Sequence, residues 1–359
     1  MRFAPSKRNS AVLALMACGW LPAFAQTPQE QIPTFRADAQ LVMVDVVADI
    51  KEKTLHTRAL LTDLKKEDIR VFDNGHEMPI RSFDIGAHYE TRPIALWLIV
   101  QCNMGDPPEW NSGFLRNKTQ LLRPALAGLH IDDAIGVAHW CGDGTASVDL
   151  PAGSDPGAAV AAVDRVISGH PVSGENRTGE VAMQKMIRMV LENVHQGKPQ
   201  RLPVFLFLYG DDCGAHENAS RRFLHGDHCG THEDEAHRII EDVLETSGVV
   251  FGMNDNGSPY NAEDMFHDGE VFHLVHYYSH ETGGQFYSTI DPRLFSAALD
   301  YILLQLHLRY TIGFKPLLVD GKRHALKVEL TKKAAKRFPG AELRFRQEYV
   351  PVAAPAPAP

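Results

Sequence analysis

Unbroken apolar runs alternate with helical patterns through the middle of the chain. Four such runs occur, at residues 94–100, 134–140, 204–209 and 249–253. They are typical of strands buried on both faces of a parallel sheet. Apolar positions at three- and four-residue spacing predict helices at residues 181–194 and 232–246. Asp291 and Pro292, a good N-cap and first-turn pair, predict a third helix at 291–308. Thr231 and Asp234 suggest a capping box for the second helix, and Gly248 is expected to end it.

Shorter strands are predicted on both sides of this region. They lie at residues 41–47, 69–72 and 80–83 before it, and at 310–314, 324–330 and 343–345 after it. The turn residues Asp73, Asn74 and Gly75 are expected to join the second strand to the third. The predicted fold class is therefore α/β, with a doubly wound, mostly parallel sheet flanked by β-rich segments that pack together.

The N-terminus has the pattern of a secretory signal peptide. Residues 1–25 carry three basic side chains, then an apolar run that ends Ala23-Phe24-Ala25. This run is shorter than a membrane span and contains Pro22, although a membrane anchor and acylation at Cys18 remain alternatives. The signal peptide predicts export, and no later stretch is long enough to span a bilayer. We therefore expect an exported protein, periplasmic or extracellular.

The remaining boundaries follow from composition and from the change in pattern. We expect a linker at 26–33, a β-rich segment at 34–90, the α/β domain at 91–300, a helix end and β segment at 301–350, and a Pro/Ala tail at 351–359.

Charge and motifs exclude several classes of function. The chain has 36 Lys and Arg against 45 Asp and Glu, a net charge of −9, and no basic patch, so nucleic acid is not expected as a partner. No phosphate loop, dinucleotide fingerprint or nucleophile elbow occurs in a strand-to-helix context. These absences disfavour the commonest enzyme classes.

A loop rich in histidine and cysteine follows the run at 204–209. Its candidate metal ligands are Cys213, His216, His225, His228, Cys229, His232 and His237. Thiolate and imidazole are the ligands that Zn²⁺ and Cu⁺ select. The spacing of His232 and His237 does not match the H-E-x-x-H motif of zinc proteases. An alternative, which we favour, is a disulfide between Cys213 and Cys229, because an oxidising compartment promotes thiol pairing.

Several segments, in the same order, resemble the von Willebrand factor A-related proteins that some bacteria secrete. They are DIRVFDNGHEMPIRSF, residues 281–286 (ETGGQF), and LRYTIGFKP followed by DGKRHALKVEL. The similarity covers residues 34–350. The resemblance implies a ligand site at the carboxyl ends of the parallel strands, in which an Asp-x-Ser-x-Ser loop, a Thr and an Asp bind a divalent cation.

This chain departs from that pattern at the cation site. The first loop has Gln101, Asn103 and Gly105 where the resemblance implies Asp, Ser and Ser. Thr178 matches the family's Thr, and Asp211 and Asp212 lie close to the position of its Asp. Because the loop has lost the carboxylate and both hydroxyls of the family's motif, we expect a degenerate adhesion site, with no cofactor or only weak Mg²⁺ binding. These six residues form the predicted binding rim.

Four cysteines follow the predicted signal peptide, and four cysteines allow three pairings. Cys102 and Cys141 end the first two parallel runs, which are neighbours in the fold that the resemblance implies, so a disulfide between them is reasonable. Two unpaired buried thiols are the alternative.

The sequence thus predicts an exported von Willebrand A-like module that binds an unidentified protein partner or serves as a scaffold. Its alternative is a zinc- or copper-binding protein, or a metal-dependent hydrolase, that uses residues 213–237. A third possibility is an inert structural protein of the cell envelope.

Overall fold

A computed structural model describes most of the chain from Leu41 to Pro351. The described residues are 41–51, 58–85, 93–102, 114–141, 144–153, 155–169, 179–196, 201–209, 231–254, 266–267, 270–271, 274–289 and 291–351. Residues 1–40, which include the predicted signal peptide, lie outside the described residues. None of the described helices is long and apolar enough to cross a membrane.

A six-stranded sheet forms the centre of the α/β region. Its strands are β6 (Ile94–Gln101), β7 (Ala134–Trp140), β8 (Ala146–Gly153), β9 (Leu202–Tyr209), β11 (Val249–Asn254) and β14 (Gln285–Ser288). Their order is β14-β11-β9-β6-β7-β8, and all neighbours are parallel except β7 and β8. The prediction of a mostly parallel α/β sheet is therefore confirmed. The chain moves outward in opposite directions from β6, so the strand order reverses between β6 and β9.

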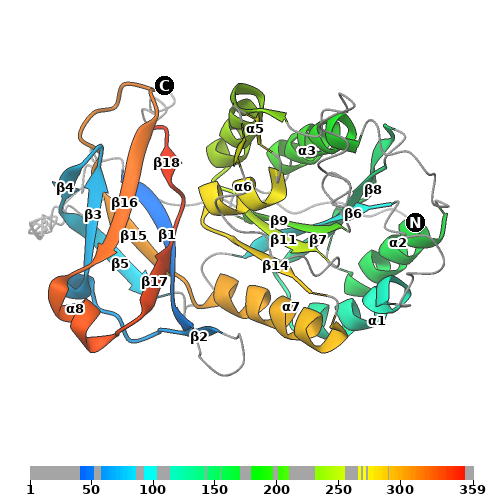
Figure 1. Cartoon of the computed structure of the whole chain (residues 1–359), viewed down its shortest axis with the longest axis horizontal. Coiled ribbons are helices and arrows are strands. Elements are labelled where there is room, and N and C mark those ends of the chain that lie inside the picture. The colour runs from blue at the N-terminus through cyan, green and yellow to red at the C-terminus, as the bar shows by residue number, and fades with distance from the viewer. Residues whose placement is uncertain are drawn as a thin grey trace, which may run out of the picture. The chain divides into compact units, whose positions relative to one another are not determined.

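Helices cover both faces of this sheet (Figure 1). One face packs against α1 (Phe114–Leu126), α2 (Pro156–Gly169) and α7 (Pro292–His307). The other packs against α3 (Gly179–Gln196), α5 (Glu233–Glu245) and α6 (Leu274–Thr282). Alternate residues of β6 enter the two cores, Leu96 and Leu98 on the first and Trp97 and Ile99 on the second. This two-sided burial explains why the strand has no polar alternation.

Strands from the two ends of the sequence pair with each other. One sheet has the order β17-β1-β15-β5, in which β17 is Ala341–Arg344, β1 Val42–Lys51, β15 Tyr310–Phe314 and β5 Ile80–Ile85, and β2 (Arg58–Leu60) also pairs with β1. A second has the order β18-β16-β3-β4, with β18 at Glu348–Tyr349, β16 at His324–Leu330, β3 at Ile69–Asp73 and β4 at His76–Met78. They share an apolar core that includes Val44, Val71, Ile312 and Val328.

Three shorter features complete the described structure. A 3-10 turn, η1 (Lys66–Asp68), precedes β3, and α8 (Lys332–Arg337) follows β16. A small sheet has the order β10-β13-β12, in which the strands are Thr231–His232, Glu270–Val271 and Phe266–His267.

The turn at Asn74 and Gly75 is confirmed, but its predicted partners were partly wrong. Both residues have positive φ, 47° and 81°, as a two-residue hairpin requires. The hairpin pairs β3 with the short strand β4, whereas β5 crosses to the other sheet and pairs with β15. A local turn signal identifies the reversal of the chain, but it does not identify the next strand's sheet.

Both predicted ends of α5 were also displaced. The helix begins at Glu233, and Thr231 lies in β10, so the predicted capping box does not start it. At the other end the left-handed position is Ser247, with φ of 58°, while Gly248 donates its N–H to the carbonyl of Val243. Gly248 is needed for another reason, because a Cβ there would lie 2.6 Å from the Phe205 ring.

Candidate functional site

The carboxyl ends of the parallel strands carry polar groups, but few of the predicted rim residues are described. Gln101 ends β6 and is 5% exposed, so its amide faces into the protein. Asn103, Gly105, Thr178, Asp211 and Asp212 lie outside the described residues. Among the described residues, Asn254 and Ser288 also end strands on this edge, which the sequence analysis missed. No recognisable motif marks the ends of these strands. Only the order of the strands in the sheet places Asn254 and Ser288 on the same edge as Gln101.

Cys102 and Cys141 lie side by side on the same edge. Their Cα atoms are 5.1 Å apart, within the range for a disulfide, and both side chains are buried. The Cys102 N–H donates to the Trp140 carbonyl, which continues the β6–β7 pairing by one residue. The first loop of the rim therefore begins directly beside the end of β7.

The histidine-rich loop is mostly outside the described residues. This applies to Cys213, His216, His225, His228 and Cys229, and the side chain of His232 is not described either. His237 is on α5, and its Nδ1 lies 2.5 Å from the hydroxyl of Tyr277 on α6. The described residues contain no group of three or more metal-ligating side chains, so the predicted zinc or copper site stays a prediction.

Two histidines on α6 have pKa values shifted in opposite directions. His276 stacks on Phe286 with 5.0 Å between ring centroids, and burial, with a smaller contribution from nearby His280, lowers its pKa. The side chain of His280 hydrogen-bonds Glu281 over 3.0 Å, which raises its pKa. Protonation of His276 therefore destabilises the folded chain, whereas protonation of His280 stabilises it.

We expect these shifts to be visible in the pH dependence of stability. His276 binds a proton less readily in the folded chain than in the unfolded one. The folded state therefore loses stability as pH falls below about 6.5. His280 contributes stability below about 6.5 that is lost as pH rises. Thermal melts between about pH 5.5 and 7.5 will therefore show a smaller acid-induced loss of Tm for His276→Gln and a larger one for His280→Gln than for wild type. Two variants that both follow the wild-type pH dependence would contradict this assignment.

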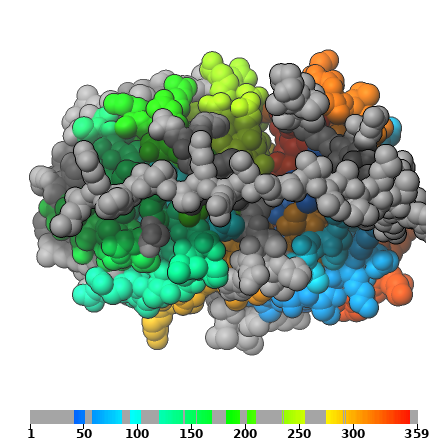
Figure 2. Space-filling view, turned by 180° about the vertical axis from the view of Figure 1, so that it is seen from behind, coloured from blue at the N-terminus to red at the C-terminus, as the bar shows by residue number. Residues whose placement is uncertain are grey.

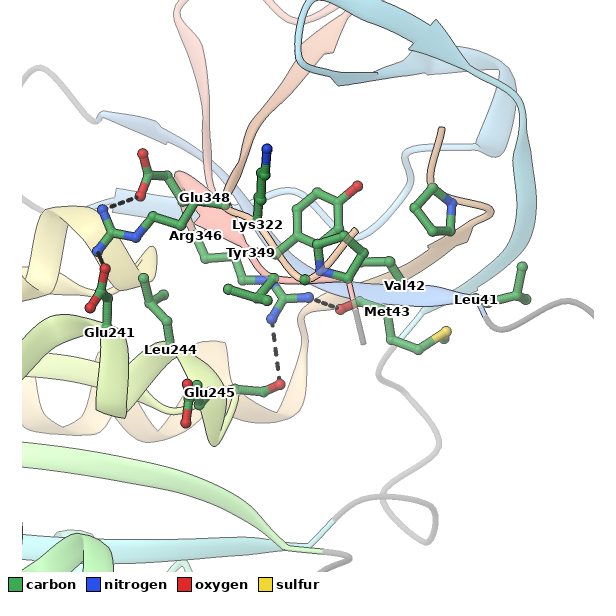
Figure 3. A pocket seen from close by; sticks show the side chains of 16 residues that line it. Leu41, Val42, Met43, Glu241, Leu244, Glu245, Lys322, Arg346, Glu348 and Tyr349 are labelled. Atoms are coloured by element: carbon green, nitrogen blue, oxygen red, sulfur yellow. Dashed lines mark hydrogen bonds and ion pairs between the residues drawn. The ribbon is translucent and has the colours of Figure 1, made fainter. Parts of the chain in front are cut away.

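A second candidate site is a groove of about 1040 Å³ between α5 and the strands β1 and β18. Its apolar lining includes Leu41, Val42, Met43, Leu244, Pro316, Tyr349, Val350 and Pro351. Its charged lining consists of Glu241, Glu245, Lys322, Arg323, Arg346 and Glu348. Figure 3 shows these side chains converging from α5 and from the strands. No local sequence pattern indicates this groove, because its walls come from segments far apart in the chain.

Two arginines cross this groove. Arg323 bridges Glu241 of α5 over 2.7 Å and Glu348 of β18 over 2.9 Å. The guanidinium of Arg346 donates to the main-chain oxygen of Met43 over 2.7 Å and to Ser247 Oγ over 3.4 Å (Figure 3). The arginines thus connect α5 and the residues that follow it to the β-rich region.

Comparison with known proteins finds only remote similarity. No family model and no curated protein matches the chain. A solved von Willebrand factor type A protein from Catenulispora acidiphila is 11% identical over 88% of this chain and 75% of its own, with a TM-score of 0.42. An aerotolerance-related membrane protein from Bacteroides fragilis is 14% identical over 59% of this chain and 99% of its own, with a TM-score of 0.39. The conserved hypothetical protein BatB from Bacteroides thetaiotaomicron is 14% identical over 59% and 98%, with a TM-score of 0.36. Similarity at this level does not identify a function.

Proposed function

We propose that this chain is an exported protein-binding module of the von Willebrand A type that captures its partner at the carboxyl edge of the parallel sheet without a bound metal. The observation that carries the proposal is the end of β6. Gln101 occupies this position and is 5% exposed, so the first loop starts with a buried neutral amide instead of a carboxylate. Mg²⁺ sites depend on carboxylate oxygens, and the three motif positions of this loop, Gln101, Asn103 and Gly105, supply none.

The topology supports the choice of this edge for binding. Open α/β sheets bind ligands outside the carboxyl ends of their strands, where the strand order reverses. In this chain the reversal lies between β6 and β9, and the loops that carry Asn103, Asp211 and Asp212 leave these two strands. Thr178 immediately precedes α3 and is the other polar member of the predicted rim.

We further propose that Cys102 and Cys141 form a disulfide in the exported protein. Their Cα separation of 5.1 Å supports this pairing, and an oxidising compartment favours it. The bond would hold the start of the first rim loop against the end of β7. A rim held in this way needs less ordering when a partner binds, which favours affinity without a metal.

Partner capture with and without chelator tests the metal-independent binding. The mature chain is crosslinked to envelope proteins of the producing cell, and captured proteins are quantified in the presence and absence of EDTA. We expect EDTA to leave capture unchanged, and replacement of Thr178, Asp211 and Asp212 by Ala to reduce it at least about tenfold.

A control variant separates the rim from general charge effects. Asp242→Ala removes an exposed acid on α5 and should leave capture unchanged. Loss of capture in EDTA would contradict metal independence. Failure to capture any protein would instead favour an inert structural role.

Native mass spectrometry without chelator or reductant tests export and the alternative metal site. We expect a chain that starts at Gln26, lacks bound metal and is lighter by two hydrogens for each disulfide. A mass that includes zinc or copper, with Cys213 and Cys229 reduced, would overturn the binding-module proposal in favour of a metal site in the histidine-rich loop.

A further inference from the structure

The connection between β15 and β16 exposes three consecutive large apolar residues. Leu317, Leu318 and Val319, here called the apolar loop, are 50%, 59% and 51% exposed. Elsewhere in the described part of the chain, exposed large hydrophobic residues occur singly, as at Ile131 and Leu304. Soluble monomers rarely expose contiguous apolar patches unless they serve an interaction. The loop therefore marks a candidate interface.

Hydrogen bonds hold the apolar loop in this exposed position. The Leu317 N–H donates to Asp73 Oδ2 over 2.8 Å, and the other Asp73 oxygen lies 2.6 Å from His324 Nδ1. On the far side of the loop, Asp320 accepts the Lys322 N–H over 2.9 Å and lies 3.2 Å from His324 Nε2. Asp73 and His324 are buried, so both ends of the loop are fixed to the core. Little ordering remains to oppose binding.

The apolar loop adjoins the groove described above. Pro316 on one side of the loop, and Gly321 and Lys322 on the other, line the groove together with Leu244 of α5. The segment that carries the loop lies on the same face as α5 (Figure 2, orange and yellow-green). An apolar projection and a groove with apolar and charged lining residues are thus neighbours on one surface.

One basic and one acidic side chain of the groove are available to pair with another molecule. Arg323 is paired with Glu241 and Glu348, and Arg346 is bonded to Met43 and Ser247. Lys322 and Glu245 are exposed, and neither has an ion pair among the described residues. This balance gives no excess of positive charge to attract an anionic membrane. It suits a surface that binds its own copy, because a two-fold axis that passes midway between Lys322 and Glu245 places each charge opposite its complement.

We propose that this face is a two-fold interface between two copies of the chain. The apolar loop of one copy packs into the groove of the other, Lys322 pairs with the partner's Glu245, and Glu245 pairs with the partner's Lys322. Ser247 and Leu244 of the groove precede β11, so the interface lies at the amino ends of the strands and leaves the carboxyl edge open. The inference is therefore independent of the proposed function, and a dimer would present two binding edges.

Sedimentation velocity of the mature chain, from about 1 to about 100 µM, tests the dimer. We expect a reversible dimer whose Kd rises at least about tenfold in Leu318→Ser, Lys322→Glu and Glu245→Lys. The double variant Lys322→Glu with Glu245→Lys should recover the wild-type Kd, because the pairs re-form with their signs exchanged. Leu304→Ser, an equally drastic change at an exposed leucine of α7, should have no effect.

Each contrary result overturns a defined part of the proposal. A wild-type chain that stays monomeric over the whole range excludes the dimer. Dimers that tolerate Leu318→Ser, or a double variant that remains as weak as the single ones, exclude this packing arrangement. A monomer that floats with phosphatidylglycerol vesicles, and loses this binding in Leu318→Ser, would assign the apolar loop to a membrane surface instead.

Discussion

Replacing Asp49 by alanine will lower the free energy of unfolding by about 3 kcal/mol, because it leaves two guanidinium groups that are only 15% exposed without their shared carboxylate. Asp49 is on β1 and is fully buried. Its Oδ1 accepts from Arg58 Nε over 2.7 Å, and its Oδ2 accepts from the Tyr301 hydroxyl over 2.8 Å and from Arg344. Arg344 also donates to Gln305 of α7 over 2.9 Å and to Gln285 of β14. The cluster thus joins the β-rich region to the α/β region.

Urea denaturation monitored by circular dichroism measures this effect, and Glu342→Ala provides the control. Glu342 also pairs with Arg58, but its side chain is 58% exposed, so its loss should cost less than about 1 kcal/mol. Tyr301→Phe removes one hydrogen bond of the cluster and should cost about 1 kcal/mol. If Asp49→Ala were no more destabilising than Glu342→Ala, the cluster would not be a main contributor to stability.

Removing the proposed disulfide should have a comparable effect. Cys102 and Cys141 are separated by 39 residues, and closing a loop of this length stabilises the folded chain by about 4 kcal/mol in the chain-entropy account. Cys141→Ala and the double variant with Cys102→Ala should lose equal stability, because either change removes the same bond. Chemical denaturation with and without dithiothreitol measures the loss.

Two comparisons separate the contribution of this disulfide from that of Cys213 and Cys229 and from the packing of the thiols. The double variant in which Cys102 and Cys141 are Ala should lose little further stability in reductant through this pair, whereas a chain with Cys213→Ala and Cys229→Ala should lose the full amount. In reductant, wild type against the first double variant measures the packing contribution of the thiols alone. A Cys213→Ala, Cys229→Ala chain that is insensitive to reductant would exclude the Cys102–Cys141 bond.

The hydrophobic pattern of the sequence was sufficient to predict the strands that are buried on both faces. The runs at 94–100 and 249–253 became β6 and β11 because both faces of these strands are covered, which leaves no polar alternation to obscure them. The helices α1 and α2 were missed. In α1 the signal against a helix is Pro124, which falls within the last turn, although its apolar residues do lie on one face. In α2 small alanines make up much of the sequence, so its apolar periodicity is weak.

The sequence by itself therefore determined the strand-and-helix alternation, the mostly parallel sheet, and the neutral Gln101 at the end of β6. Only the tertiary structure decided which distant residues meet. Asp49 receives donors from Arg58, Tyr301 and Arg344, and the groove joins Met43, Leu244 and Arg346. Such contacts follow from the packing of separate elements. The local pattern around each residue reflects only the secondary structure and burial of its own segment, so no periodicity or short motif identifies the distant partner.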